Sequence, residues 1–180
     1  MGENVCLWSR VVSSGKKWPS GDGPPWPSGF SEFRMFRGNY PATVDGKGRL
    51  KIPAAIKAVL DDIHATDFYV TSHDGQSVRI YPFQEWLKLE EKLKQQPSMN
   101  KSVKKFLDRT NYYGQAAHTD SQGRILVPAL LRESASMQGE VAVLGHLNYL
   151  EVWNKQRYVE HMEKEPFTEE DQNALRDLGI

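Results

Sequence analysis

The sequence has almost no cysteine, no long hydrophobic run and no obvious set of metal-binding side chains. Its single cysteine, Cys6, excludes an internal disulfide framework and a cysteine-based zinc site. No apolar run approaches the roughly 20 residues that a membrane-spanning helix needs, and no apolar stretch typical of a secretory signal follows the first residues. We therefore expect a cytoplasmic protein.

Recognisable catalytic motifs are missing as well. The five histidines are scattered, without the one-turn spacing that places two metal ligands on one helix face. Serine nucleophile elbows and glycine-rich phosphate loops do not occur. Related barrel folds include enzymes, so the fold alone excludes nothing. Because no acid–base set converges, we expect a protein that is not an enzyme and that needs neither a cofactor nor a metal ion.

The chain also lacks net charge, since 23 basic residues balance 23 acidic ones. Proteins that bind nucleic acids neutralise phosphates with clustered lysine and arginine, so a neutral total counts against this function. A neutral total can still include a basic face. Any hypothesis of DNA binding must therefore locate that face.

Residues 1–34 show no helical or strand periodicity. They are rich in glycine and proline, yet they contain three of the five tryptophans, which is unusual for a disordered linker. Patterned sequence begins at Met35. We interpret residues 1–34 as a disordered or misassigned N-terminal extension, with natural translation starting at Met35.

The remaining sequence contains one motif twice. Residues 43–54 read TVDGKGRLKIPA, and residues 118–129, 75 positions later, read HTDSQGRILVPA. Both copies fit the pattern Asp-x-x-Gly-Arg-(Leu/Ile)-x-(Ile/Val)-Pro-Ala. Repetition of this length is very rarely accidental, so the chain consists of two similar halves.

The flanks of the two motifs also match. Each copy is followed by a short helical pattern, an apolar strand, a turn, a second strand and a closing helix. Alternation in each copy predicts that two apolar side chains point inward while the residue between them points outward. A half of this size buries too little apolar surface to be stable alone, so we expect the two halves to share one barrel. The predicted helices begin at Ala54, Phe83, Ser98 or Asn100, Ala129, after Trp153 and at Thr168.

From Met35 to about residue 165 the sequence resembles the MraZ family. The resemblance rests on the opening Met35-Phe36-Arg37-Gly38, on the two Asp-x-x-Gly-Arg motifs and on the segment Pro82-Phe83-x-x-Trp86. It implies a mixed α/β, mainly β fold with two tandem AbrB/MraZ-type swapped-hairpin (β-barrel) repeats and flanking helices. We expect a first repeat with its helix at 35–97, a second repeat with helices at 98–165 and a C-terminal helix or tail at 166–180.

The resemblance also implies a function. Members of this family are expected to bind double-stranded DNA at G-rich direct repeats as ring-shaped homo-oligomers. They are expected to repress the division and cell-wall gene cluster, including their own gene, which implies a nucleoid-associated protein. Repeated subunits on repeated sites would offset the neutral charge, because avidity strengthens binding ~100- to 10,000-fold without any new contact.

The motif arginines are the first candidates for DNA contact. A guanidinium can bind O6 and N7 of guanine with two hydrogen bonds, which suits a G-rich site. The first motif is the more cationic, because Gln122 and Leu126 occupy the positions that correspond to lysines in the first copy. We therefore expect the first half to make more phosphate contacts. The predicted DNA-binding residues are Arg37, Lys47, Arg49, Lys51, Gln122 and Arg124.

The other motif residues favour a tight turn. Aspartate accepts hydrogen bonds from the backbone two residues on, and glycine accepts a positive φ. We assign this structural role to Asp45 and Gly48 in the first copy and to Asp120 and Gly123 in the second. The arginines could equally form ion pairs that only hold the turn, and this alternative is more open for Arg124 than for Arg49.

Two other functions fit parts of the sequence. An AbrB-like protein can chiefly bind a protein partner, although such proteins tend to have one motif copy and a disordered tail. A purely structural scaffold oligomer is the other possibility. The scaffold predicts that Arg49→Ala changes assembly, whereas the regulator predicts that it changes DNA affinity.

Overall fold

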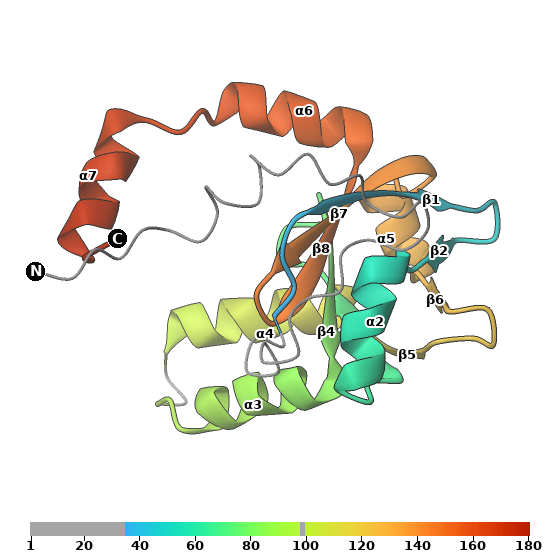
Figure 1. Ribbon diagram of the computed structural model, residues 1–180. Coiled ribbons are helices and arrows are strands. Elements are labelled where there is room, and N and C mark those ends of the chain that lie inside the picture. The colour runs from blue at the N-terminus through green and yellow to red at the C-terminus, as the bar shows by residue number, and fades with distance from the viewer. Residues whose placement is uncertain (1–34, 98–99) are drawn as a thin grey trace, which may run out of the picture. The chain divides into compact units, whose positions relative to one another are not determined.

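The computed structural model describes residues 35–97 and 100–180, so the interpretation of residues 1–34 lies outside the described part. The first half contains two strands, a helix, two strands and a helix, and the second half repeats this order after an additional helix (Figure 1). The elements of the first half are β1 (Asn39–Val44), β2 (Arg49–Lys51), α2 (Ala54–Asp62), β3 (Asp67–Thr71), β4 (Val78–Pro82) and α3 (Phe83–Lys94). Those that follow are α4 (Lys101–Tyr113), β5 (Gln115–His118), β6 (Arg124–Leu126), α5 (Ala129–Ser134), β7 (Gly139–His146), β8 (Tyr149–Asn154), α6 (Lys155–Lys164) and α7 (Glu169–Asp177).

All eight strands belong to one sheet, in the order β5-β3-β4-β8-β7-β1-β2-β6. Every strand of the first half pairs with a strand of the second half: β1 with β7, β2 with β6, β3 with β5 and β4 with β8. A bridge between Thr119 and Ile125 links the two ends of this order. The sheet is thus a nearly closed barrel in which two swapped hairpins interleave, as predicted.

This pairing has approximate two-fold symmetry. Exchanging the halves maps the β1–β7 pair onto the β5–β3 pair and maps the β2–β6 pair onto itself. Two backbone hydrogen bonds show the same exchange: Val127 donates to Gly48, and Ile52 donates to Gly123. The ranges 35–97 and 98–165 remain a proposal for the limits of the sequence repeats, since the strands of both form a single core.

The inward residues of both motifs help to form that core. Leu50 and Ile52 in the first copy and Ile125 and Val127 in the second are all buried, as their alternation predicts. The strands that follow contribute valines and isoleucines, among them Val70 and Ile80, which are fully buried. Burial of these side chains on the inside of the barrel fixes which face of β2 and β6 points outward.

The helices begin close to the predicted positions. Pro53 and Pro128 lie one residue before α2 and α5 and accept their first helical hydrogen bonds, so each occupies the N-cap and not the first helical turn. Asn100, one of the two predicted starting positions, is the N-cap of α4, and its side chain accepts hydrogen bonds from the amides of Ser102 and Val103. A capping box between Thr168 and Asp171 starts α7, where the sequence predicts a helix.

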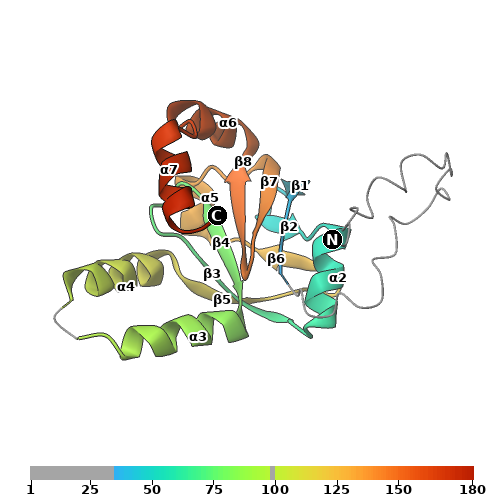
Figure 2. The same ribbon diagram turned by 60° about the vertical axis from the view of Figure 1, so that its left-hand side comes forward.

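The helices α3 and α4 lie side by side next to β3 and β4 in both views (Figures 1 and 2). Trp86 anchors α3: its ring stacks on Tyr69 at 4.2 Å between centroids, and its indole donates to Glu90 at 2.8 Å. The helix α6 contacts β7 and β8, where Trp153 packs near Tyr158. In Figure 1 these three helices lie away from the turns that precede β2 and β6.

Candidate nucleic-acid interface

The first Asp-x-x-Gly-Arg motif forms the tight turn between β1 and β2. The Oδ1 atom of Asp45 accepts hydrogen bonds from the backbone amides of Lys47 and Arg49, both at 2.9 Å. Gly48 has a φ of +80°, which glycine adopts without a steric cost. The Arg49 side chain turns back onto the same carboxylate, with Nε and Nη2 each 2.7 Å from Oδ2. One carboxylate therefore holds both the turn and the arginine.

The second motif reproduces this turn between β5 and β6. Oδ1 of Asp120 accepts from the amides of Gln122 at 2.9 Å and Arg124 at 3.0 Å. Nε and Nη2 of Arg124 lie 2.7 Å from Oδ2, and Gly123 has a φ of +69°. Both loops project at the right-hand edge of Figure 1. The duplicated sequence motif is therefore also a duplicated geometry.

Both turn aspartates are stabilised in the ionised form. Hydrogen bonds from the backbone amide and the guanidinium of Arg49 lower the pKa of Asp45 to about 2. The guanidinium of Arg124, followed by backbone amides, lowers the pKa of Asp120. Each carboxylate occupies one edge of its guanidinium, and the Nη1 atoms form no hydrogen bond with residues that the structure describes. Each arginine thus presents free donors in a fixed direction.

Between the two turns, β2 and β6 form a short antiparallel ribbon. Arg49 lies opposite Leu126, and Lys51 lies opposite Arg124. Because opposite and alternate residues share one face of a sheet, all four side chains point outward. Leu126 is 53 % exposed. The ribbon therefore carries three cations and one apolar side chain on its outer face, with a motif turn at each end.

The other predicted residues occupy different places. Lys47 and Gln122 are exposed at equivalent positions of the two turns. Arg37 lies at the far end of β1 from the first turn, where the backbone at its amide approaches Gly145. The structure therefore gathers Lys47, Arg49, Lys51, Gln122 and Arg124 around the ribbon and leaves Arg37 apart from them.

Two further cations near the turns were not singled out from the sequence. Lys57 on α2 lies against Gly123, and Arg132 on α5 lies against Gly48, so each helix contacts the turn of the other half. These two residues occupy equivalent positions, 75 apart, as the motifs do. The shared offset of 75 residues is the feature of the sequence that could have identified this pair of cations. Their closeness to the turns could not be predicted, because it depends on how the strands of the two halves pair.

Comparison with known proteins matches each half of the chain separately. A family model described as "MraZ protein, putative antitoxin-like" matches residues 35–109 and again residues 114–178. The chain belongs to the MraZ family. Each matched segment contains one Asp-x-x-Gly-Arg motif, so the resemblance predicted from the sequence is confirmed.

Individual MraZ relatives match at high identity. The chain is 52 % identical over 146 residues to "Transcriptional regulator MraZ" of Acidobacterium capsulatum, and 49 % identical over 147 residues to the protein of the same name from Koribacter versatilis. A third relative of that name, from Halothermothrix orenii, is 36 % identical over 147 residues. Each match covers 81 % of this chain and 100 % of the relative.

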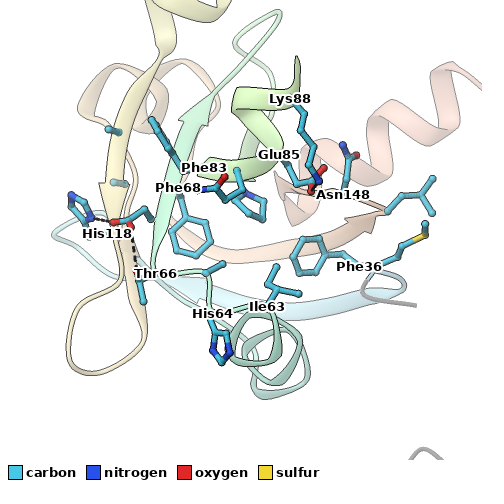
Figure 3. Close-up of a pocket in the computed structure, with 18 residues that line it drawn as sticks. Phe36, Ile63, His64, Thr66, Phe68, Phe83, Glu85, Lys88, His118 and Asn148 are labelled. Atoms are coloured by element: carbon cyan, nitrogen blue, oxygen red, sulfur yellow. Dashed lines mark hydrogen bonds and ion pairs between the residues drawn. The ribbon is translucent and has the colours of Figure 1, made fainter. Parts of the chain in front are cut away.

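A cavity of about 860 Å³ opens elsewhere on this member of the MraZ family, next to β3, β5 and the start of α3 (Figure 3). Phe36, Phe68 and Phe83 form part of its apolar lining. Polar side chains of its lining pair with one another: His118 is hydrogen-bonded to Asp67, and Lys88 forms an ion pair with Glu85. None of the predicted DNA-binding residues lines this cavity.

Within residues 35–97 and 100–180, no group of three or more histidine, cysteine, aspartate or glutamate side chains is arranged to hold a metal ion. No helix there is both long and apolar enough to cross a membrane.

Proposed function

We propose that the chain is a sequence-specific, DNA-binding transcriptional regulator that contacts double-stranded DNA through the outer face of the β2–β6 ribbon and its two turns. The observation that supports this most directly is the pair of arginines, Arg49 and Arg124, each held by an aspartate with its remaining donors outward. The MraZ relatives are named as transcriptional regulators, which fits this role. No enzymatic activity and no cofactor form part of the proposal.

The held arginines suit recognition of guanine. A guanidinium has five N–H donors, and the aspartate uses one edge of it. The outward fork of Nη1 and Nη2 is left to meet O6 and N7 of guanine in the major groove, the commonest base-specific contact. Lys47, Lys51 and Gln122 then contact phosphates or base edges beside the arginines, and Arg37 contacts the backbone at a separate point. A G-rich site is the operator that these residues favour.

The proposal includes assembly and a genetic target. A ring homo-oligomer on direct repeats upstream of its own gene gains avidity, which offsets the absence of net charge. We propose that the protein acts there as a repressor of the division and cell-wall gene cluster, as a cytoplasmic protein associated with the nucleoid.

The test is a binding measurement with duplex DNA from upstream of the gene, a scrambled duplex as control, and light scattering to follow oligomer size. We expect wild type to prefer the upstream duplex and Arg49→Ala to lose ~1–3 kcal/mol of binding free energy with its oligomer intact. Arg124→Ala measured in the same way reports whether the second motif contacts bases.

Two results would contradict the proposal. Equal affinity of the wild type for both duplexes would remove sequence-specific binding. Loss of binding by Arg49→Ala only through dissociation of the oligomer would favour a scaffold or a protein that binds a protein partner.

A further inference from the structure

Arg132 lies at the edge of the first motif turn and has no hydrogen-bond or ion-pair partner among residues 35–97 and 100–180. Its side chain packs so closely on Gly48 that a Cβ atom there would lie 2.2 Å from Cδ and 2.7 Å from Nε of Arg132. The Nε atom is buried and has no hydrogen-bond partner in the part of the chain that the structure describes. The neighbouring Glu133 is exposed and forms no ion pair with Arg132 among the described residues. Buried donors are nearly always paired in proteins, so Nε is an exception. The Nη atoms form no hydrogen bond or ion pair with the described residues either, so the partly exposed end of this guanidinium is able to bind an anion.

The equivalent cation of the first half is neutralised. Lys57, which lies over the other turn, forms an ion pair with Asp61 one helical turn later, at 2.6 Å. The helix α5 ends at Ser134, and the position four residues after Arg132 is Ser136, which has a φ of +51° and lies outside the helix. The second half therefore lacks the carboxylate that pairs with this cation in the first half.

The surroundings of Arg132 are rich in positive charge. Lys47, at the tip of the same turn, is exposed, and Arg49 closes that turn. Asp45 is the carboxylate that the turn itself supplies, and it is already bonded to Arg49. This end of the ribbon therefore has three cations, Lys47, Arg49 and Arg132, and one carboxylate, Asp45. Arg132 is partly exposed, so an oxygen atom from outside can reach its guanidinium.

We propose that Arg132 binds a backbone phosphate of DNA beside the first motif turn, so that a residue of the second half completes the DNA contact of the first. This inference rests on the proposed function. A phosphodiester fits because its two non-bridging oxygens match the paired donors of a guanidinium. A phosphate has the same chemistry at every sequence, so Arg132 adds affinity but no base preference.

The experiment compares Arg132→Gln, Arg132→Lys and the matched control Lys57→Gln in the full chain. Binding to the upstream duplex and to the scrambled duplex is measured by fluorescence anisotropy over a series of KCl concentrations. We expect Arg132→Gln to weaken binding to both duplexes by the same factor. We also expect it to reduce the slope of log K against log[KCl] by about one for each bound subunit. Arg132→Lys keeps the slope, and Lys57→Gln changes it less than Arg132→Gln does.

Folding and assembly are followed in the same samples. Because the Nε atom is unpaired in the free protein, Arg132→Gln is expected to leave the thermal midpoint unchanged or to raise it, with oligomer size unchanged. An unchanged salt slope would overturn the inference. So would a loss confined to the upstream duplex, an equal effect of Lys57→Gln, or a change in oligomer size without a change in slope.

The same measurements distinguish a failure of the inference about Arg132 from a failure of the proposed function. If wild type binds and Arg49→Ala weakens that binding while Arg132→Gln has no effect, the inference about Arg132 fails and the regulator remains. If wild type binds neither duplex, the proposed function and this inference fail together.

Discussion

Each motif arginine is held by an aspartate four residues earlier, and this pairing limits the freedom of a long side chain before any ligand arrives. A free arginine loses up to about 2 kcal/mol of rotamer entropy when it is fixed. In Arg49 and Arg124 part of that loss is already incurred on folding, because two nitrogens of each guanidinium contact one carboxylate oxygen. In the function that we propose, the aspartates thus act on DNA binding through the arginines and not by contact with phosphate.

Acid should weaken the first turn. The pKa of Asp45 is lowered to about 2 in the folded protein, so its ionised form contributes stability that is complete above the unfolded value near 4. That contribution is lost as the pH falls from about 4 through about 2. We expect wild type to be more stable than Asp45→Asn at neutral pH and the difference to close toward pH 2. Urea unfolding of both proteins at several pH values measures it, and a difference independent of pH would contradict the assignment.

At this scale the motif itself was predictable and its surroundings were not. The spacing of Asp45, Gly48 and Arg49 is local, so turn chemistry alone predicts the hydrogen bonds from the backbone to the aspartate. The position of Arg132 depends on a neighbour 84 residues earlier in the chain, Gly48, and on the early end of α5. Neither is visible in a local pattern.

At the scale of elements, α3 is attached to the barrel mainly through Trp86. This side chain is 2 % exposed and lies against Tyr69 and Tyr81, while most of the helix surface is exposed. The sequence predicts a helix that begins at Phe83, as α3 does. Its contact with β3 and β4 explains why a polar helix with a single buried residue adopts one position.

Replacing Trp86 should therefore destabilise the protein strongly. We expect Trp86→Ala to lower the free energy of unfolding by about 3–5 kcal/mol, because a large buried ring is lost and a cavity is left. Leu87→Ala, one residue later, is the control: Leu87 is 40 % exposed, so its loss should cost far less. Chemical denaturation of both variants measures the difference, and similar losses would show that α3 is not anchored in this way.

Helix starts and strand segments were predicted well because caps and alternation are local signals. Asn100, Thr168 and the inward Leu50 all lie where the patterns indicate. The sequence pattern does not predict which strands pair with each other. For example, β1 pairs with β7, which lies far along the chain, and no feature of either strand specifies the other.

For the whole molecule, the decisive feature is that each half supplies partners for the strands of the other. A shared barrel was expected from the small size of each half, and the sheet order confirms it. The pairing β2–β6 lies on the approximate two-fold axis, which brings the two motif arginines to one ribbon. A single half would leave each of its four strands without its partner from the other half.

Separated halves should consequently fail to fold as monomers. We expect residues 35–97 alone to be unfolded or dimeric, because the second half no longer buries their apolar faces. Mixing residues 35–97 with residues 98–180 should restore strand signal in circular dichroism, with a one-to-one complex in light scattering. Cooperative unfolding of monomeric 35–97 would contradict the interleaved pairing.

The interleaving also sets the order of events during synthesis. Tyr40 pairs with Val143, so β1 leaves the ribosome about 100 residues before its partner. At roughly 5–20 residues per second, it waits about 5–20 s in the nascent chain with its edge unpaired. Fusion of the two halves in one polypeptide ends that interval reliably, because the second half arrives tethered beside the first at a local concentration that separate chains do not reach.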